Sequence, residues 1–191
     1  YYKICKSYFP CGSPLANEEP MKGLLQGNLE FARNLLKESG YDGTPIVVLK
    51  STDTISIANQ PDVAKSLLEK VGFKVDVQSA DWQTVVGRRT KKDPPAQGGW
   101  NAIVSAWGAL DIANPITTAF LNASCDKALF GWPCDETIEK LRNDFAKETD
   151  PGKQKEIADR IQERAIEVTT HIPLGQYKQP AAVRNNVQGL I

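Results

Sequence analysis

Two side chains within IVSAWGALDIANPITTAF, residues 103–120, are suited to binding a small molecule. Trp107 closes an apolar run, where an indole can line a pocket and donate a hydrogen bond from its N–H. Asp111 follows four residues later, beyond Gly108, and its carboxylate can form a charge-assisted hydrogen bond with a ligand ammonium group. The alternative role for Asp111 is to accept hydrogen bonds from nearby backbone N–H groups. We therefore predict that Trp107 and Asp111 contact a ligand, and keep backbone capping as the alternative role of Asp111.

Asn114 and Tyr177 complete the set of candidate ligand-binding residues. Asn114 directly precedes Pro115, and this pair predicts the start of a helix over PITTAFL, residues 115–121. A purely structural role as N-cap is thus the alternative for Asn114. Tyr177 lies in the final extended segment, which proline and glycine interrupt.

The sequence contains few residues in arrangements typical of catalysis. A nucleophile–base pair would need a cysteine or serine beside a histidine, and His171 is the only histidine. We interpret His171 as a residue at the C-terminal end of a helix, where an imidazole can contact exposed carbonyls. Neither a Walker-type loop nor G-x-G-x-x-G is present. We predict that the protein is not an enzyme; the alternative is a small secreted hydrolase that uses cysteine or serine with His171.

The four cysteines form two pairs that are close in sequence, Cys5 with Cys11 and Cys125 with Cys134. Neither pair has the C-x-x-C spacing of a zinc or redox motif, so with one histidine we predict no metal site and no cofactor. Closing the loop between the second pair would stabilise the fold by about 2–3 kcal/mol. The even count in two local pairs favours disulfides and an oxidising compartment. Reduced cysteines in a cytosolic protein are the alternative.

The composition is that of a soluble globular protein, with 41% apolar and 24% charged residues in 191. The net charge is zero, with 23 basic and 23 acidic residues, which argues against nucleic acid and against a polybasic membrane surface as partners. No apolar run approaches the roughly 20 residues of a membrane helix. The chain begins YYKICKSYFP, without an initiator Met or a leader, so we expect a fragment of a longer chain.

Helical and extended patterns alternate along the first half of the chain and would position these residues. Leu29, Ala32, Leu35 and Leu36 predict one buried stripe on the first helix, and Trp82 and Trp100 are expected in the core. The expected elements are a helix over 28–41 capped by Asn28, a strand over 45–51, a helix over 59–73 with Pro61 in its first turn, a strand over 74–80, a short helix over 82–89, a loop over 90–99 and a strand over 100–107.

An internal similarity supports this order. ARNLLKESGY (32–41) and AKSLLEKVGF (64–73) match in residue type, and each precedes a predicted strand, as in two successive helix–strand modules. The second half adds helices that begin at Asp135 and at Asp150-Pro151, followed by short extended pieces. We predict an α/β fold with a mainly parallel or mixed sheet flanked by helices. Ligands bind such sheets beyond the carboxyl ends of the strands.

The order FARNLLKESGY, VAKSLLEKVGFKVDVQSADW, AWGALDIANP, DETIEKL, DPGKQKEIADRIQE and IPLGQYKQPAAV resembles one family from about Gly27 onward. It is similar to the C-terminal lobe of the extracytoplasmic solute-binding proteins of ABC transporters, family 5, the oligopeptide, dipeptide and nickel class. The resemblance implies one lobe of a type II periplasmic-binding-protein fold over residues 1–191, with 1–20 irregular or close to a hinge. It also implies a missing N-terminal lobe, a peptide-like or other small solute, ABC permease subunits as partners and a periplasmic location.

In peptide-binding members of that family, an aspartate shortly after the Trp of this strand pairs with the free amino group of the peptide. Trp107 and Asp111 match that pattern, but the segment from Trp to Pro is about one residue longer, and Asn114 replaces the usual acid before the proline. The loop 90–99 also resembles an insertion. The resemblance therefore leaves open a different cation-bearing or sugar-like solute. A structural or signalling module without a ligand is the remaining alternative.

Overall fold

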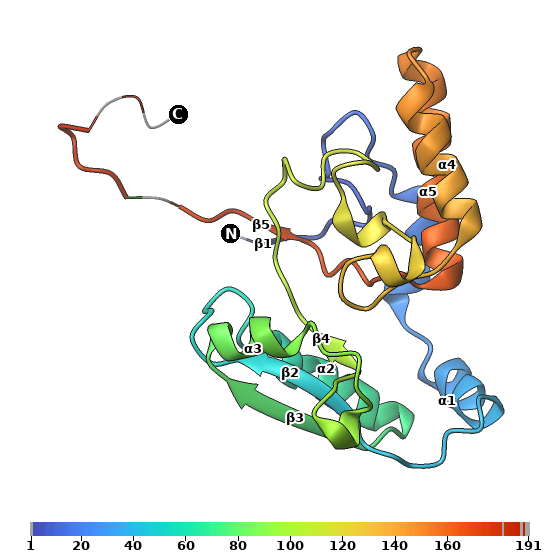
Figure 1. The fold of residues 1–191 in the computed structure, drawn as a ribbon, viewed down its shortest axis with the longest axis vertical. Helices are drawn as coiled ribbons and strands as arrows, with labels where there is room; N and C mark the ends of the chain where they lie inside the picture. Colours follow the sequence, from blue (N-terminus) through green and yellow to red (C-terminus); the bar gives the residue numbers. More distant parts are fainter. Residues whose placement is uncertain (1, 181, 188, 190–191) are drawn as a thin grey trace. The chain divides into compact units, whose positions relative to one another are not determined.

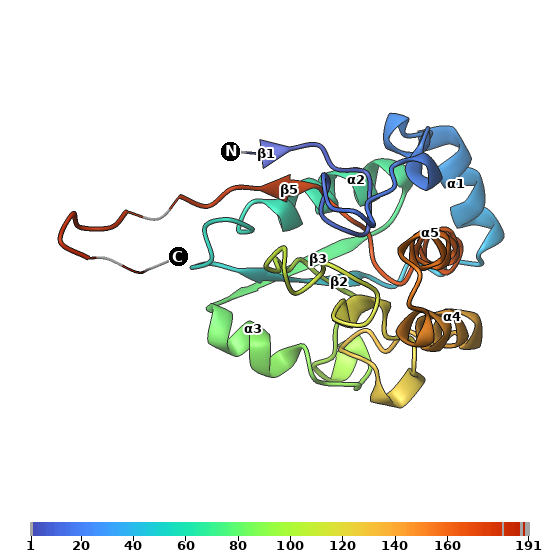
Figure 2. The same cartoon turned by 90° about the horizontal axis from the view of Figure 1, so that it is seen from above.

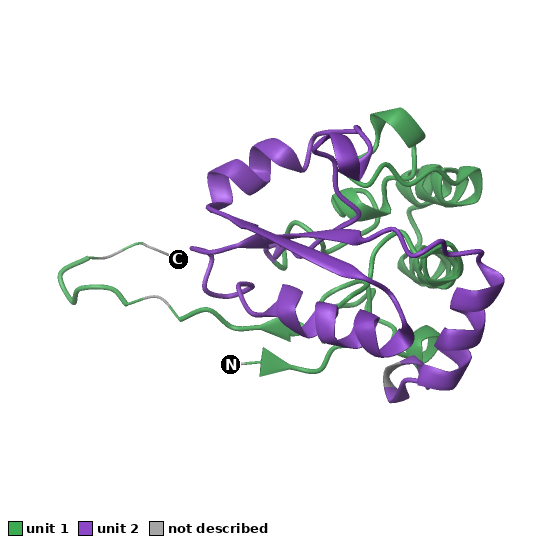
Figure 3. Ribbon diagram, turned by 90° about the horizontal axis from the view of Figure 1, so that it is seen from below, with its two compact units in different colours: residues 1–22, 109–191 green, residues 23–108 purple. Residues whose placement is uncertain are grey.

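The computed structural model describes residues 2–180, 182–187 and 189, so the last extended pieces of the chain lie partly outside the described residues. The chain divides into two compact units (Figure 3). Unit 1 comprises Tyr1–Lys22 and Ala109–Ile191, and unit 2 comprises Gly23–Gly108. The boundary at Gly108 lies inside the segment that carries the candidate ligand contacts.

Unit 2 is built on a three-stranded parallel sheet in the order β3-β2-β4. The helices α2 and α3 cover opposite faces of this sheet (Figure 2). Its elements are α1 (Leu29–Glu38), β2 (Ile46–Ser51), α2 (Gln60–Val71), β3 (Val75–Ala80), α3 (Trp82–Arg88) and β4 (Ala102–Ile103), with the 3-10 turns η2 (Leu24–Gln26) and η3 (Pro95–Gln97).

Alternate side chains of a strand point to opposite faces of the sheet, and both faces of the central strand β2 are buried. Val47 and Leu49 pack with Val85 of α3, while Val48, 1% exposed, points to the other side. Trp82 and Trp100 are partly buried and pack against the cluster of Val47, Leu49 and Val85, so they lie at the border of the core in which they were expected.

Unit 1 is a helical hairpin with an irregular N-terminal segment packed against it. Helices α4 (Glu136–Lys147) and α5 (Pro151–Val168) are joined by three residues (Figure 1). A two-stranded antiparallel pair, β1 (Tyr2–Lys3) with β5 (Gln176–Tyr177), links the two ends of the chain. The 3-10 turns of this unit are η1 (Glu19–Met21), η4 (Ala119–Leu121) and η5 (Cys125–Lys127). The core contains Tyr8, Phe9, Met21, Leu121, Ala123, Ile138, Leu141, Phe145, Ala158, Ile161 and Ala165.

Side-chain caps place the helix starts where the sequence predicts them. Asn28 accepts a hydrogen bond from the backbone N–H of Phe31, and Asp150 accepts one from Lys153. Each such cap stabilises a helix by about 1 kcal/mol. Residues that are adjacent in the sequence therefore define these helix starts.

Three predicted features differ from the structure. The strand expected over 100–107 is only β4, because this edge strand pairs with β2 and separates from it after Ile103. The stripe on α1 is not buried: Leu29 is 42% and Leu35 49% exposed, since α1 lies beside the end of α2 rather than across the sheet (Figure 1).

The third difference is the helix expected over 115–121, which forms one turn followed by η4. The hydroxyl groups of Thr117 and Thr118 both donate hydrogen bonds to the backbone carbonyl of Asn114. Threonine hydroxyls thus compete with backbone N–H groups for this carbonyl, and threonine is a weak helix former.

The α/β class is confirmed, with parallel pairing in one sheet and antiparallel pairing in the other. Among the described residues, no helix has both the length and the apolar character needed to cross a membrane.

Candidate functional site

Trp107 lies in unit 2, four residues beyond the end of β4, so it does not stand directly at the exit of a regular strand as expected. Its side chain is 38% exposed. A large aromatic surface that remains accessible to solvent can still line a binding site.

Asp111 lies in unit 1, in an exposed turn where the N–H of Ala113 bonds the carbonyl of Leu110. Among the residues that the structure describes, none forms a hydrogen bond or ion pair with the Asp111 carboxylate, so the described contacts give it no local capping role. An exposed carboxylate without a protein partner can accept hydrogen bonds from a ligand.

The other two candidates are already engaged by the protein. Asn114 Oδ1 accepts hydrogen bonds from the backbone N–H groups of Ile116 at 2.9 Å and Thr117 at 3.1 Å. The ring of Tyr177, on β5, lies 5.8 Å from the ring of Tyr2. Within the described residues, no hydrogen bond or ring contact joins Asp111, Asn114 and Tyr177 to one another.

A polar cluster that the sequence analysis missed lies at the carboxyl edge of the sheet in unit 2. Ser51, the last residue of β2, donates its hydroxyl hydrogen to Asp53 Oδ1 at 2.8 Å. The same carboxylate oxygen accepts the backbone N–H of Trp82 at 2.8 Å, which ties the loop after β2 to the start of α3. The signal was present as the polar run STDT, which begins at the last residue of the buried strand. The cluster thus fixes the loop after β2 to the start of α3 at the edge where parallel sheets commonly bind ligands.

His171 sits among aromatic rings in unit 1. Its ring centroid is 4.6 Å from that of Tyr8 and 5.1 Å from that of Phe120, and its Nδ1 lies 3.2 Å from the Thr170 hydroxyl. Burial lowers the pKa of the imidazole to about 4. Among the described residues, no carboxylate orients the ring. A neutral, enclosed imidazole of this kind is a poor general base.

Two disulfides join Cys5 to Cys11 and Cys125 to Cys134, as expected from the local pairing. No described cysteine is free. A cysteine nucleophile is therefore absent from the described residues in this oxidised state, which weakens the hydrolase alternative.

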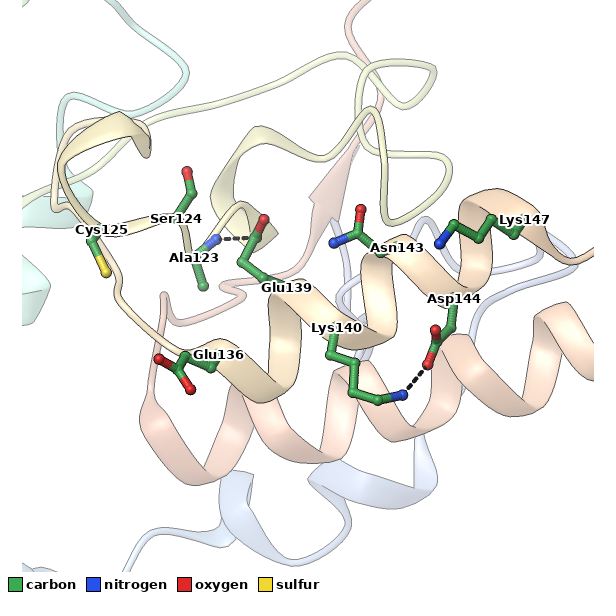
Figure 4. A pocket seen from close by; sticks show the side chains of 9 residues that line it. All are labelled: Ala123, Ser124, Cys125, Glu136, Glu139, Lys140, Asn143, Asp144 and Lys147. Carbon is green, nitrogen blue, oxygen red and sulfur yellow. Dashed lines mark hydrogen bonds and ion pairs between the residues drawn. The ribbon is translucent and has the colours of Figure 1, made fainter.

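An open depression of about 680 Å³ runs along the outer face of α4 (Figure 4). Several of its charged side chains already bind other groups of the protein. Glu139 accepts a hydrogen bond from the backbone N–H of Ala123 at 2.8 Å, and Lys140 forms an ion pair with Asp144 at 2.6 Å. None of the candidate ligand contacts lines it. The full lining is Ala123, Ser124, Cys125, Glu136, Glu139, Lys140, Asn143, Asp144 and Lys147.

Residues 1–128 match the family described as bacterial extracellular solute-binding proteins, family 5 middle region. This chain belongs to family 5 of the bacterial extracellular solute-binding proteins. The match contains the whole of unit 2 and the segment with Trp107, Asp111 and Asn114.

Curated relatives of this family 5 protein bear names of peptide-binding transport proteins. A probable peptide ABC transporter periplasmic-binding protein of Sinorhizobium fredii is 30% identical over 192 residues, which cover 100% of this chain and 36% of the relative. The di/tripeptide-binding protein 4 of Pseudomonas aeruginosa is 27% identical over 171 residues, 85% of this chain and 31% of the relative. The chain thus spans about a third of the length of the curated relatives it matches.

The fold agrees with that of solved family members. The ABC transporter substrate-binding protein CtaP of Listeria monocytogenes superposes with a TM-score of 0.73 at 15% identity, over 89% of this chain and 34% of CtaP. At this level of identity the likeness concerns the fold, and it confirms the expected type II periplasmic-binding-protein architecture.

Proposed function

We propose that this family 5 chain is part of the solute-binding component of an ABC importer, which captures a small peptide-like solute outside the cytoplasmic membrane and delivers it to the permease. The observation that carries the proposal is the exposed carboxylate of Asp111, which has no partner among the described residues, in the segment where the sequence predicts a contact with a ligand ammonium group. The names of the curated relatives support a peptide as the solute.

The chemistry of the candidate contacts fits a solute with a free amino group. A carboxylate such as that of Asp111 forms a charge-assisted hydrogen bond with an ammonium group, worth about 1.5–3 kcal/mol. Trp107 would supply apolar surface, and Tyr177 an additional hydroxyl group. Asn114, which is already bonded to two backbone N–H groups, would shape the loop that carries Asp111.

We further propose that residues 1–191 form one lobe of a longer protein and that the solute is held between this lobe and an N-terminal lobe. A ligand that contacts both lobes shifts the open–closed equilibrium by its preference for the closed form. The protein would bind its solute without chemical conversion, in an extracytoplasmic compartment where the two disulfides persist.

The test is calorimetry on the complete protein with alanine di- and tripeptides and their N-acetylated forms. Asp111→Asn should weaken binding of the free peptides roughly tenfold to a hundredfold, because 1.4 kcal/mol corresponds to a factor of ten. Asp93→Asn, which changes an exposed acid in the loop 90–99, serves as the matched control and should leave the affinity unchanged. Equal affinities of the wild type and Asp111→Asn would show that the carboxylate does not contact the solute. Absence of binding by the wild type would exclude these peptides as the solute.

A further inference from the structure

The antiparallel strands β1 and β5 form a short ribbon in unit 1 (Figure 2). Its register pairs Tyr2 with Tyr177 and Lys3 with Gln176. One face of the ribbon is covered by the chain itself. The side-chain oxygen of Gln176 accepts a hydrogen bond from the backbone N–H of Cys11 at 3.1 Å, and Lys3 lines a depression together with Cys11. The loop around Cys11 therefore packs on the face that carries Lys3 and Gln176.

The opposite face of the ribbon is apolar and exposed. Alternation along the chain places Ile4 on the same side as Tyr2, and the burial of Cys5, the next residue, agrees with this. Tyr2 and Ile4 are both 72% exposed, and the segment before β5 adds Ile172 and Leu174, which are 69% and 64% exposed. We call Tyr2, Ile4, Ile172 and Leu174 the ribbon surface. Exposed apolar side chains that gather in one region, rather than occur singly, mark an interaction site.

The ribbon is too small to be stable by itself. Each strand has two residues, and each has one edge without a partner strand among the described residues. A two-stranded pair is marginally stable in water, and independent stability requires further strands or the packing of a hydrophobic face. The loop around Cys11 supplies such packing on one face only. We therefore expect another segment to cover the ribbon surface.

We propose that the N-terminal lobe of the complete protein packs on the ribbon surface. This interface rests on the proposed function, in which residues 1–191 form one lobe of a longer protein. The lengths of the curated relatives are compatible with such a lobe, since this chain covers 36% and 31% of them. Apolar side chains of the lobe would remove the ribbon surface from water, and this burial is the dominant favourable contribution to association.

The small size of the ribbon surface favours a covalently connected partner over a second copy of the protein. A stable interface between separate proteins takes roughly 20–30 residues on each side. The ribbon surface contributes four side chains. A segment of the same chain needs less contact area, because its covalent connection gives it a high effective concentration.

The experiment is site-specific photo-cross-linking of the complete protein without added solute. The photoreactive residue p-benzoyl-phenylalanine replaces Ile4 in one variant and Ile172 in a second. On irradiation it inserts into C–H bonds of the groups that contact it. Tandem mass spectrometry should identify cross-links from both positions to peptides outside residues 1–191. The same probe in place of Lys140, whose side chain is 75% exposed on α4, is the control and should give no such product.

Three results would overturn the proposal. Cross-links confined to residues 1–191 would show that this chain covers the ribbon surface itself. Products with the mass of two copies would assign the surface to a dimer. Absence of products from both ribbon positions, or equal linking from position 140, would show that the N-terminal lobe does not select this surface.

The interface and the proposed function can fail separately. Calorimetry with the alanine peptides tests the solute, whereas the cross-linking needs no ligand. Cross-links to the N-terminal lobe in a protein that binds none of these peptides would support the interface and contradict the peptide as solute. Peptide binding without these cross-links would support the function and contradict the interface.

Discussion

Gln162 is a polar side chain without exposed surface in the middle of α5. Its Oε1 accepts hydrogen bonds from the Ser7 hydroxyl at 2.9 Å and from the backbone N–H of Tyr8 at 3.1 Å. These bonds connect the N-terminal segment to the helical hairpin across 155 and 154 positions of the sequence. Gln162 therefore positions Tyr8 and Phe9, which are both part of the core of unit 1.

We predict that Gln162→Leu lowers the free energy of unfolding by about 1–3 kcal/mol. The leucine leaves the N–H of Tyr8 buried without a partner, and an unsatisfied buried donor costs about this much. Urea unfolding followed by circular dichroism measures the change. Gln179→Leu, at an exposed position of unit 1, is the control and should change stability by less than about 0.5 kcal/mol. Equal effects of the two substitutions would show that the buried amide has no special structural role.

His171 should make the fold sensitive to acid. Its pKa is lowered by burial to about 4 in the folded protein, below the usual value near 6.5, so the folded state favours the neutral ring. The stabilisation is fully present above pH 6.5 and is lost as the pH falls toward 4, because the unfolded chain then binds the proton more strongly. At pH 4.5 the loss amounts to roughly 2–3 kcal/mol.

The variant His171→Phe isolates this effect from the carboxylates that titrate in the same range. Phenylalanine keeps a ring between Tyr8 and Phe120 but cannot take up a proton. The difference in unfolding free energy between pH 7 and pH 4.5 should be smaller in the variant than in the wild type, as measured by urea unfolding. The same pH dependence in both proteins would show that the imidazole is already accessible to protons in the folded state.

At the scale of elements, one carboxylate joins the two helices of the hairpin. Asp135 Oδ1 caps α4 by accepting the N–H of Ile138 at 2.8 Å, and Oδ2 accepts two hydrogen bonds from Arg164 of α5 at 2.7 and 3.1 Å. The Arg164 guanidinium holds the pKa of the Asp135 carboxyl below its ordinary value. The stabilisation from this carboxylate is therefore present above its ordinary pKa near 4 and declines as the pH falls below it.

We predict that Asp135→Ala destabilises the protein by about 2–3 kcal/mol, since it removes both a helix cap and a charged hydrogen bond. Asp150→Ala is the matched control, because Asp150 caps α5 but has no arginine partner among the described contacts, and it should cost only about 1 kcal/mol. Chemical unfolding of the two variants side by side gives the comparison. Losses of equal size would show that the bond to Arg164 adds nothing to the cap.

The elements that the sequence predicts well are those defined by local chemistry. The two similar segments form α1 before β2 and α2 before β3. The ring centroids of their matching aromatic residues, Tyr41 and Phe73, are 4.9 Å apart. The starts of α1, α3, α4 and α5 follow from side-chain caps, and that of α2 from Pro61 in its first turn. The strands β2 and β3 follow from short apolar or alternating runs between turn residues. The short β4 and the exposed stripe of α1 depend on which neighbours each element finds in space, and residue periodicity carries no information about this.

The same distinction between local and long-range determinants applies to the candidate contacts. Trp107 and Asp111 could be selected from residue type and spacing, and both are exposed in the structure. The contact between Asp53 and Trp82 spans 29 positions, and the contact between Glu18 and the Cys5–Cys11 pair also requires a folded loop. Such contacts come from the path of the chain between regular elements, which a single sequence determines only through the complete fold.

At the scale of the whole molecule, both disulfides lie in unit 1, whereas unit 2 contains no cysteine. Each bond closes a short loop and stabilises the folded state by about 2–3 kcal/mol in the chain-entropy account. Unit 2 has its own core around β2, built from alternating strand residues and α3. A reductant can therefore break covalent cross-links in unit 1 but has none to break in unit 2.

We predict that reduction of the disulfides destabilises unit 1 and leaves unit 2 folded. Hydrogen exchange with mass spectrometry should show faster exchange in peptides from α4, α5 and the N-terminal segment, while peptides from β2, β3 and α2 keep their protection. A variant with all four cysteines replaced by serine provides the control, because a reductant should not change its exchange pattern. Faster exchange throughout both units on reduction would show that they unfold as one cooperative structure, since local cores that are energetically independent open separately.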